Sequence, residues 1–90
     1  MMIVTEDAKQ ELRRRLVAQT NDPEIGLRLR LNLPGRFRLV LGRESDGDQV
    51  IEYGGSKVLL IGRDSADLVA GWTLGVRYTA EGSKLVLSMD

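Results

Sequence analysis

Residues 25–41 have the sequence IGLRLRLNLPGRFRLVL, and this stretch decides the fold. Leucine alternates with a polar residue before the Pro-Gly pair, and apolar residues return at every second position after it. A period of two indicates strands with one buried face, so the stretch predicts a β-hairpin. A two-residue loop would set leucines opposite arginines on the core face, whereas a loop of residues 34–36 sets apolar residues opposite each other. We therefore predict the odd loop, with Arg36 at its tip. The predicted pairs are Leu33 with Phe37, Leu31 with Leu39, and Leu29 with Leu41.

The N-terminal part of the chain predicts a helix. Thr5 followed by two acidic residues is typical of an N-cap, and the helix is expected to end near Gln19. Its apolar stripe recurs every four residues, at Ala8, Leu12 and Leu16. The helical rotation spreads the arginines of residues 13–15 widely, so we interpret them as a solvated face near the end of the helix.

Further strands are predicted by alternation and turn residues at 49–53, 57–61, 72–78 and 85–87. Residues 58–61 are continuously apolar, which predicts a central strand covered on both faces. A short helix through residues 66–69 would be capped by Asp64 or Ser65 and stopped by Gly71. The whole pattern predicts a mainly β, α+β fold. It would have about six short, mostly antiparallel strands in a sandwich or pseudo-barrel, with an N-terminal helix and one short insert helix.

The composition limits the chemistry of these residues. The 90 residues contain no cysteine and no histidine, which removes thiol nucleophiles, imidazole bases and the usual ligands of zinc and iron-sulfur clusters. We therefore predict no cofactor, no metal ligand and no catalytic residue. Serines have no histidine to activate them, and carboxylates are spread over turns and helix starts, so no enzyme is predicted. Iron held by carboxylates alone remains open.

The length of the sequence indicates a single domain spanning residues 1–90. The chain carries no net charge, but residues 1–43 have a net charge of +4 and residues 44–90 a net charge of −4. No apolar run is long enough to cross a membrane, and no signal peptide is recognisable, so a cytoplasmic location is expected. A domain this small gains from burying further apolar surface, which favours a homodimer or another protein partner.

The order of elements and several short motifs resemble the HesB/IscA family, the A-type iron-sulfur cluster biogenesis domain. The similar stretches are residues 3–8 opening the helix, residues 26–29 opening the first strand, and residues 58–85. Within the last stretch the similar positions are Gly62, Asp64, Ser65, Leu68, Gly71, Leu74, Tyr78 and Gly82. The resemblance spans nearly the whole chain and implies a HesB-like fold.

The resemblance also implies where a cluster would be held. Members of the family bind iron or an iron-sulfur cluster through three cysteines, one after a glycine in the first hairpin and two in a Cys-Gly-Cys near the C-terminus. Here Gly35 matches the glycine, Arg36 stands at the degenerate ligand position, and the sequence stops at about the place where the C-terminal pair would begin. The resemblance therefore predicts the fold without the cluster ligands.

Two functions remain open. The first is a non-catalytic binding or protein-interaction module. The second is binding of anions or nucleic acid by the first hairpin, whose polar face would carry Arg28, Arg30 and Arg38, with Arg36 at the tip. Zero net charge and the lack of interleaved aromatic residues argue against nucleic acid, and solvated strand positions would explain the same arginines. Trp72 and Tyr78 are candidates for interface anchors, but their alternation predicts core positions.

Overall fold

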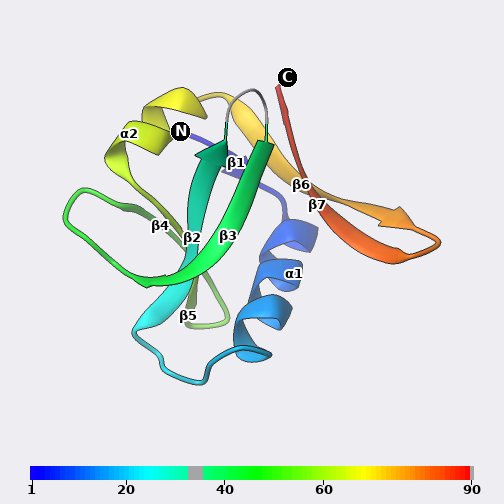
Figure 1. Ribbon diagram of the computed structural model, residues 1–90, viewed down its shortest axis with the longest axis horizontal. Helices are drawn as coiled ribbons and strands as arrows, with labels where there is room; N and C mark the ends of the chain where they lie inside the picture. The colour runs from blue at the N-terminus through cyan, green and yellow to red at the C-terminus, as the bar shows by residue number, and fades with distance from the viewer. Residues whose placement is uncertain (33–35, 90) are drawn as a thin grey trace.

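The computed structural model describes residues 1–32 and 36–89 (Figure 1). In chain order the elements are β1 (Ile3–Val4), α1 (Glu6–Val17), β2 (Ile25–Asn32), β3 (Arg36–Arg43), β4 (Gln49–Tyr53), β5 (Ser56–Ile61), α2 (Arg63–Leu68), β6 (Trp72–Thr79) and β7 (Gly82–Met89). One sheet has the order β1-β6-β7 and the other the order β3-β2-β5-β4. Their pairings are antiparallel except for β1 with β6 and β2 with β5. The mainly β, α+β architecture predicted from the sequence is confirmed.

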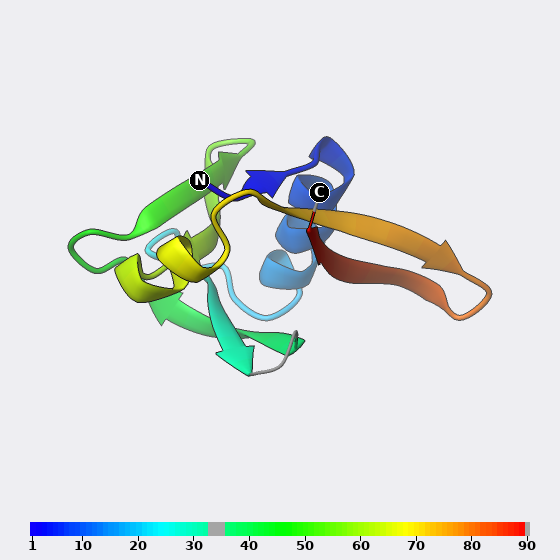
Figure 2. The ribbon, with the colours of Figure 1, turned by 90° about the horizontal axis from the view of Figure 1, so that it is seen from above.

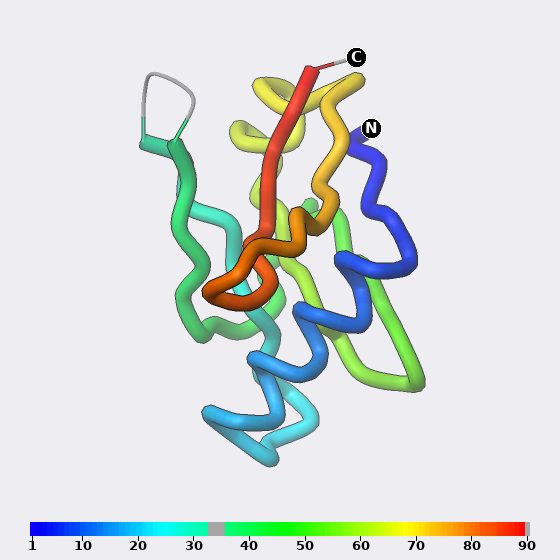
Figure 3. Tube along the Cα trace, turned by 90° about the vertical axis from the view of Figure 1, so that its right-hand side faces the viewer, coloured from blue at the N-terminus to red at the C-terminus, as the bar shows by residue number. Residues whose placement is uncertain are grey.

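Helix α1 packs against both sheets, and Figure 2 shows the β6–β7 hairpin extending outward beyond it. Seen from the side of that hairpin, β7 lies between β6 and the β2–β3 hairpin (Figure 3). The predicted N-cap is confirmed, because the Thr5 hydroxyl accepts a hydrogen bond of 3.1 Å from the Ala8 amide. The predicted stripe of Ala8, Leu12 and Leu16 is buried. Neither described helix is long and apolar enough to cross a membrane.

Strand β5 forms the centre of the core. It lies between β2 and β4, and residues 58–61 have no exposed surface, which confirms the predicted central strand. The parallel approach of β2 to β5 leaves little room at Gly26. A Cβ at that position would lie 2.7 Å from the Lys57 carbonyl oxygen. Glycine is therefore required there by the close contact between two backbones.

The β2–β3 hairpin keeps the predicted alternation but not the predicted register. Leu31 pairs with Phe37 and Leu29 with Leu39, so apolar residues do face each other. The predicted pairs Leu31 with Leu39 and Leu29 with Leu41 are wrong by a shift of two residues, and Leu33 lies outside the described residues. Arg36 is correspondingly not at a hairpin tip but pairs with Asn32 at the start of β3. Alternation fixes which face is buried, and any shift of two residues preserves it.

Two smaller expectations differ from the structure in detail. The described residues form seven strands rather than about six, because β1 adds two residues that pair with β6. Helix α2 begins earlier than expected, so Gly62 rather than Asp64 or Ser65 is its N-cap. The Gly62 carbonyl accepts the first helical hydrogen bond, from the Ala66 amide.

The aromatic residues of β6 differ in burial. Trp72 packs against the core as predicted, but Tyr78 is 70 % exposed, so its predicted core position is wrong. The outer half of β6 extends past the residues that could cover it, and residues 77–79 are all exposed. Strand β7, which pairs with β6 along its length, likewise runs from Gly82 to Met89 instead of the predicted residues 85–87.

Candidate binding cavity

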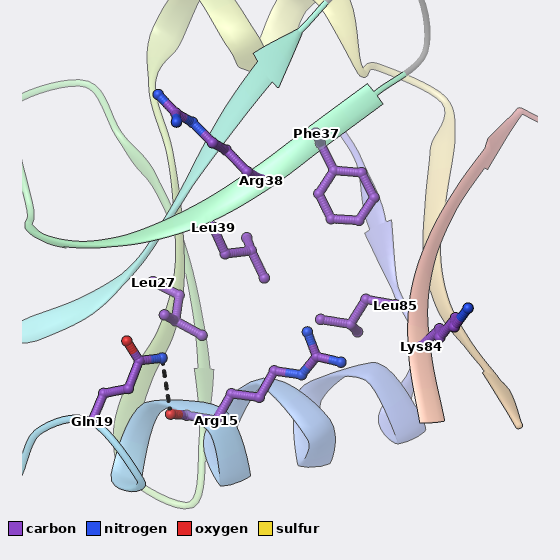
Figure 4. A pocket seen from close by; sticks show the side chains of 8 residues that line it. All are labelled: Arg15, Gln19, Leu27, Phe37, Arg38, Leu39, Lys84 and Leu85. Carbon is purple, nitrogen blue, oxygen red and sulfur yellow. Dashed lines mark hydrogen bonds between the residues drawn. The ribbon is translucent and has the colours of Figure 1, made fainter. Parts of the chain in front are cut away.

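A cavity of about 400 Å³ lies between α1, the β2–β3 hairpin and β7 (Figure 4). Strands β3 and β7 are edges of different sheets, and they do not pair with each other in the described part of the chain. The cavity thus lies where the two sheets approach without joining. Its size falls within the ~300–1,000 Å³ that is usual for small-molecule sites. The lining residues are Arg15, Gln19, Leu27, Phe37, Arg38, Leu39, Lys84 and Leu85.

One side of the cavity is apolar. We call Leu27, Phe37, Leu39 and Leu85 the apolar wall. Leu27 is buried, and the other three are partly buried against the core. Figure 4 shows all four side chains pointing toward the same space. The alternation of β3 brings Phe37 and Leu39 to this face, so the pattern that predicted the hairpin also builds the wall.

A single guanidinium enters the cavity. Figure 4 shows Arg15 extending from α1 toward Leu85, whereas the side chains of Arg38 and Lys84 run away from the space. Arg15 Nε donates to Glu11 Oε2 at 2.7 Å, and its Nη2 donates to the Ser83 carbonyl at 3.4 Å. Nη1 of Arg15 has no hydrogen-bond acceptor within residues 1–32 and 36–89. One nitrogen of this guanidinium is therefore without a hydrogen-bond partner in the described part of the chain.

Arg15 belongs to a cluster around a buried carboxylate, which we call the Glu11 cluster: Glu11, Arg14, Arg15 and Ser83. Glu11 is 8 % exposed. It accepts from Arg14 Nη2 at 2.6 Å, from Arg14 Nε at 3.1 Å and from the Ser83 hydroxyl at 2.9 Å, besides the bond from Arg15. The Arg14 hydrogen bonds are the largest cause of a pKa of about 2 for Glu11, supported by Arg15 and Ser83 and opposed by burial.

The charge of this cluster is positive. With a pKa of about 2, Glu11 is ionised at neutral pH, so one carboxylate is shared by two guanidinium groups. None of the lining residues is acidic, and Arg38 and Lys84 form no ion pair with any described residue. The cavity therefore combines an apolar wall with the partly neutralised Arg15 and with two rim cations that have no ion pair among the described residues.

The structure separates the four arginines that the sequence singles out. Arg30 and Arg38 are exposed and pair directly across β2 and β3, and the exposed Arg36 begins β3. Arg28 differs from them. Its guanidinium holds Asp48 through bonds of 2.6 and 3.3 Å, and its Nη2 also donates to the Arg43 carbonyl at 2.7 Å. Arg28 thus secures the loop between β3 and β4, while the binding role of all four remains a prediction.

Sequence reasoning missed the residues that give the cavity its charge. The arginines of residues 13–15 were expected on a solvated face, which is wrong for Arg15, because this side chain is only 37 % exposed and enters the cavity. A signal existed in the sequence, since Glu11 stands three and four residues before Arg14 and Arg15, where helical side chains meet. The part played by Ser83 depends on a contact across 72 positions of the chain, which no local pattern predicts.

Comparisons with known proteins identify the fold. The structure is similar to that of SufA from Escherichia coli, which is involved in the biosynthesis of iron-sulfur clusters, with a TM-score of 0.72 and 21 % identity over 98 % of this chain and 84 % of SufA. The chain has a HesB/IscA-like fold. IscA with its [2Fe-2S] cluster gives a TM-score of 0.65 and 18 % identity over 99 % of this chain and 85 % of IscA.

A third similar structure is that of a protein from Aquifex aeolicus, with a TM-score of 0.61 and 24 % identity. The match covers 99 % of this chain and 91 % of that protein. No protein-family model and no curated protein matches the sequence. The similarity extends over nearly the whole chain, and at these identities it concerns the fold.

The residues of this chain do not fit the cluster that IscA carries in its structure. Iron-sulfur clusters are held mainly by cysteine thiolates, with histidine as an occasional substitute. The 90 residues contain neither, and the described ones hold no group of three acidic side chains that could bind a metal. The cavity offers a guanidinium and aliphatic carbons, which do not bind iron. The described residues thus combine a HesB/IscA-like fold with a cavity whose lining contains no ligand of an iron-sulfur cluster.

Proposed function

We propose that these 90 residues form a non-enzymatic binding domain that uses a HesB/IscA-like fold without holding an iron-sulfur cluster. The observation that carries the proposal is the chemistry of the cavity. Its apolar wall and the Arg15 guanidinium suit recognition of a ligand, whereas cluster binding needs thiolates. Binding in place of cluster transfer would also agree with the absence of cysteine from the whole sequence.

The contact between Ser83 and Glu11 supports a role without catalysis. Ser83 Oγ donates to Glu11 at 2.9 Å, a geometry that a nucleophile and its base could also adopt. A general base works best with a pKa near the working pH, and the pKa of Glu11 is about 2. Glu11 is therefore a weak base that would not activate the hydroxyl. The contact is better explained as a tie between α1 and β7.

Anaerobic reconstitution with ferrous iron and sulfide tests the cluster-free proposal. After desalting, we expect no visible chromophore bound to the protein, while IscA treated in parallel serves as the positive control. A stoichiometric chromophore that survives desalting would overturn the proposal. The same sample measured with iron alone tests binding through carboxylates, for which we also expect no retained iron.

The second candidate function is anion or nucleic-acid binding by the outer face of the β2–β3 hairpin. Arg30 lies directly opposite Arg38, and like charges in this position repel each other. A bound polyanion would relieve that repulsion, which is the observation in favour. Gel shifts with short DNA and RNA at low salt test it, with the double variant Arg30→Gln/Arg38→Gln as the matched control. The absence of any shift with the unmodified protein would remove this candidate.

The binding partner is proposed to be a second copy of the chain or another protein. In support, β3 and β7 are open sheet edges, and Leu68, Tyr78 and Met89 are exposed. Sedimentation over a concentration series tests the homodimer, and a monomer at every concentration would rule it out. The cytoplasmic location stays a prediction that cell fractionation can check.

A further inference from the structure

We propose that the cavity between α1, β3 and β7 binds a small organic acid, with the carboxylate on Arg15 and the apolar body against the apolar wall. This inference rests on the proposed function and names the ligand class of that binding domain. The nucleic-acid candidate concerns the other face of β3, because Phe37 and Leu39 point into the cavity while Arg38 borders it with its side chain directed away.

The negative charge of the ligand follows from the Glu11 cluster. Arg14 and Arg15 share one ionised carboxylate, so the three groups carry a net charge of +1. The guanidinium of Arg15 is held in place by Glu11 Oε2 and the Ser83 carbonyl, and its Nη1 remains without an acceptor among the described residues. A cation that is already oriented loses little conformational freedom when it binds an anion.

The geometry favours a carboxylate over a phosphate. Only one guanidinium reaches the cavity, because Arg38 and Lys84 line it with their chains directed away (Figure 4). A monoanion matches the single guanidinium that enters the space, whereas the second charge of a phosphate would require Arg38 or Lys84 to turn inward from the rim. Phosphate sites usually provide several donors, such as a helix N-terminus or a group of basic side chains.

The apolar body of the ligand follows from the wall. Phe37, Leu39 and Leu85 surround the space next to the Arg15 guanidinium and are only partly buried by the rest of the protein. Covering their remaining exposed surface would be favourable at about 25 cal/mol per Å² of apolar area. An acid without an apolar body would leave this surface in water, and an apolar molecule without a charge would leave Arg15 Nη1 unused.

Titration of the ¹⁵N-labelled protein with three probes tests the charge and the body separately. Sodium octanoate has both, acetate has only the charge, and octylammonium has an alkyl chain of similar length with the opposite charge. We expect saturable shifts of the amides of Leu39 and Leu85 with octanoate alone. Saturable binding of octylammonium with similar affinity, or no saturable shifts with octanoate, would overturn the inference.

Two variants locate the carboxylate. Arg15→Gln removes the cation in the cavity, and we expect about tenfold weaker octanoate binding or more. Arg13→Gln is the matched control, because Arg13 is an exposed arginine of the same helix that neither belongs to the Glu11 cluster nor lines the cavity. We expect it to change affinity by about twofold or less. Equal losses in the two variants would contradict direct contact with Arg15.

The outcome stays decisive if a variant does not fold. A dispersed amide spectrum checks folding, and the comparison of the three probes needs only the unmodified protein. Failure of this inference is also distinct from failure of the proposed function. Absence of octanoate binding leaves the reconstitution result unaffected, whereas a stable iron-sulfur chromophore overturns the proposed function whether or not octanoate binds.

Discussion

Two arginine–carboxylate sites in this molecule differ in their charge balance and in their burial. In the first, Arg28 and Asp48 form a pair with one cation and one anion, and their side chains are only 13 % and 3 % exposed. In the second, Glu11 is shared by Arg14 and Arg15, which are 68 % and 37 % exposed. A balanced, enclosed pair can only hold the structure together, whereas an unbalanced cluster beside a cavity has charge left for a ligand.

The first site secures a loop. Asp48 accepts from Arg28 and from the Ser45 amide at 2.7 Å, while Arg28 donates to the Arg43 carbonyl. Arg28 is the largest cause that lowers the pKa of Asp48, with burial opposing it and the Ser45 amide assisting it. The residues that join β3 to β4 are thus closed around a neutral pair.

The largest expected effect comes from breaking the balanced pair. Arg28→Ala would leave the carboxylate of Asp48 buried without its cation, so we expect the free energy of unfolding to fall by about 3 kcal/mol. Urea denaturation measures the change. Arg30→Ala is the control, because Arg30 lies on the same face of β2 but is exposed, and its loss should stay below about 0.5 kcal/mol. Equal losses of unfolding free energy in the two variants would show that the ion pair between Arg28 and Asp48 does not stabilise the fold.

Acid should weaken the Glu11 cluster. The pKa of Glu11 is about 2 in the folded protein and 4.5 ordinarily. Its contribution to stability is therefore present above pH 4.5 and is lost as the pH falls toward 2. Because both guanidiniums are partly exposed to solvent, we expect a loss of about 2 kcal/mol in this range rather than the full value.

Urea denaturation from neutral pH to about pH 2 measures this loss. The variant Glu11→Gln isolates the contribution of Glu11 to this loss, because Asp48 titrates in both proteins and Glu11 is present in only one of them. We expect the variant to be less stable at neutral pH and to lose less on acidification. A parallel decline of the two proteins would contradict the lowered pKa of Glu11.

The smallest expected effect concerns the hydrogen bond that joins Ser83 of β7 to Glu11. Ser83→Ala removes the hydroxyl that donates to Glu11, and a single hydrogen bond to a charged group predicts a loss of about 1.5 kcal/mol of unfolding free energy. It should also raise the pKa of Glu11 toward its ordinary value. Ser88→Ala on the exposed end of the same strand is the control and should have no measurable effect. A neutral Ser83→Ala would show that the tie to β7 is unimportant.

The sequence predicted most elements because their signals are local. The alternation of residues 25–41, the four-residue stripe of α1 and the apolar run of β5 each reflect a period imposed by one element alone. The exact register of the β2–β3 hairpin was predicted wrongly, because pairings that differ by two residues bury the same face. Strand β1 was missed for a related reason, since two residues carry no period and their pairing with β6 is distant in sequence.

The candidate site was predicted less well than the fold. The sequence drew attention to Arg28, Arg30, Arg36 and Arg38, which form a visible pattern on one hairpin. The structure brings the cavity together from four elements instead, and only Arg38 of that group lines it. Among the arginines of residues 13–15, the environment decides which one is solvated. Arg15 differs from Arg14 only because β7 lies beside it.

By itself, the sequence determined the chemistry that is excluded and the periodicity that is required. The lack of cysteine and histidine removes thiolate and imidazole ligands from these 90 residues in any conformation, and the alternating leucines require a half-buried hairpin. Only the tertiary structure decided where charge remains available. The contribution of Ser83 to the pKa of Glu11 and the bond from Arg15 to the Ser83 carbonyl depend on distances between α1 and β7, and those distances are set by packing rather than by sequence neighbours.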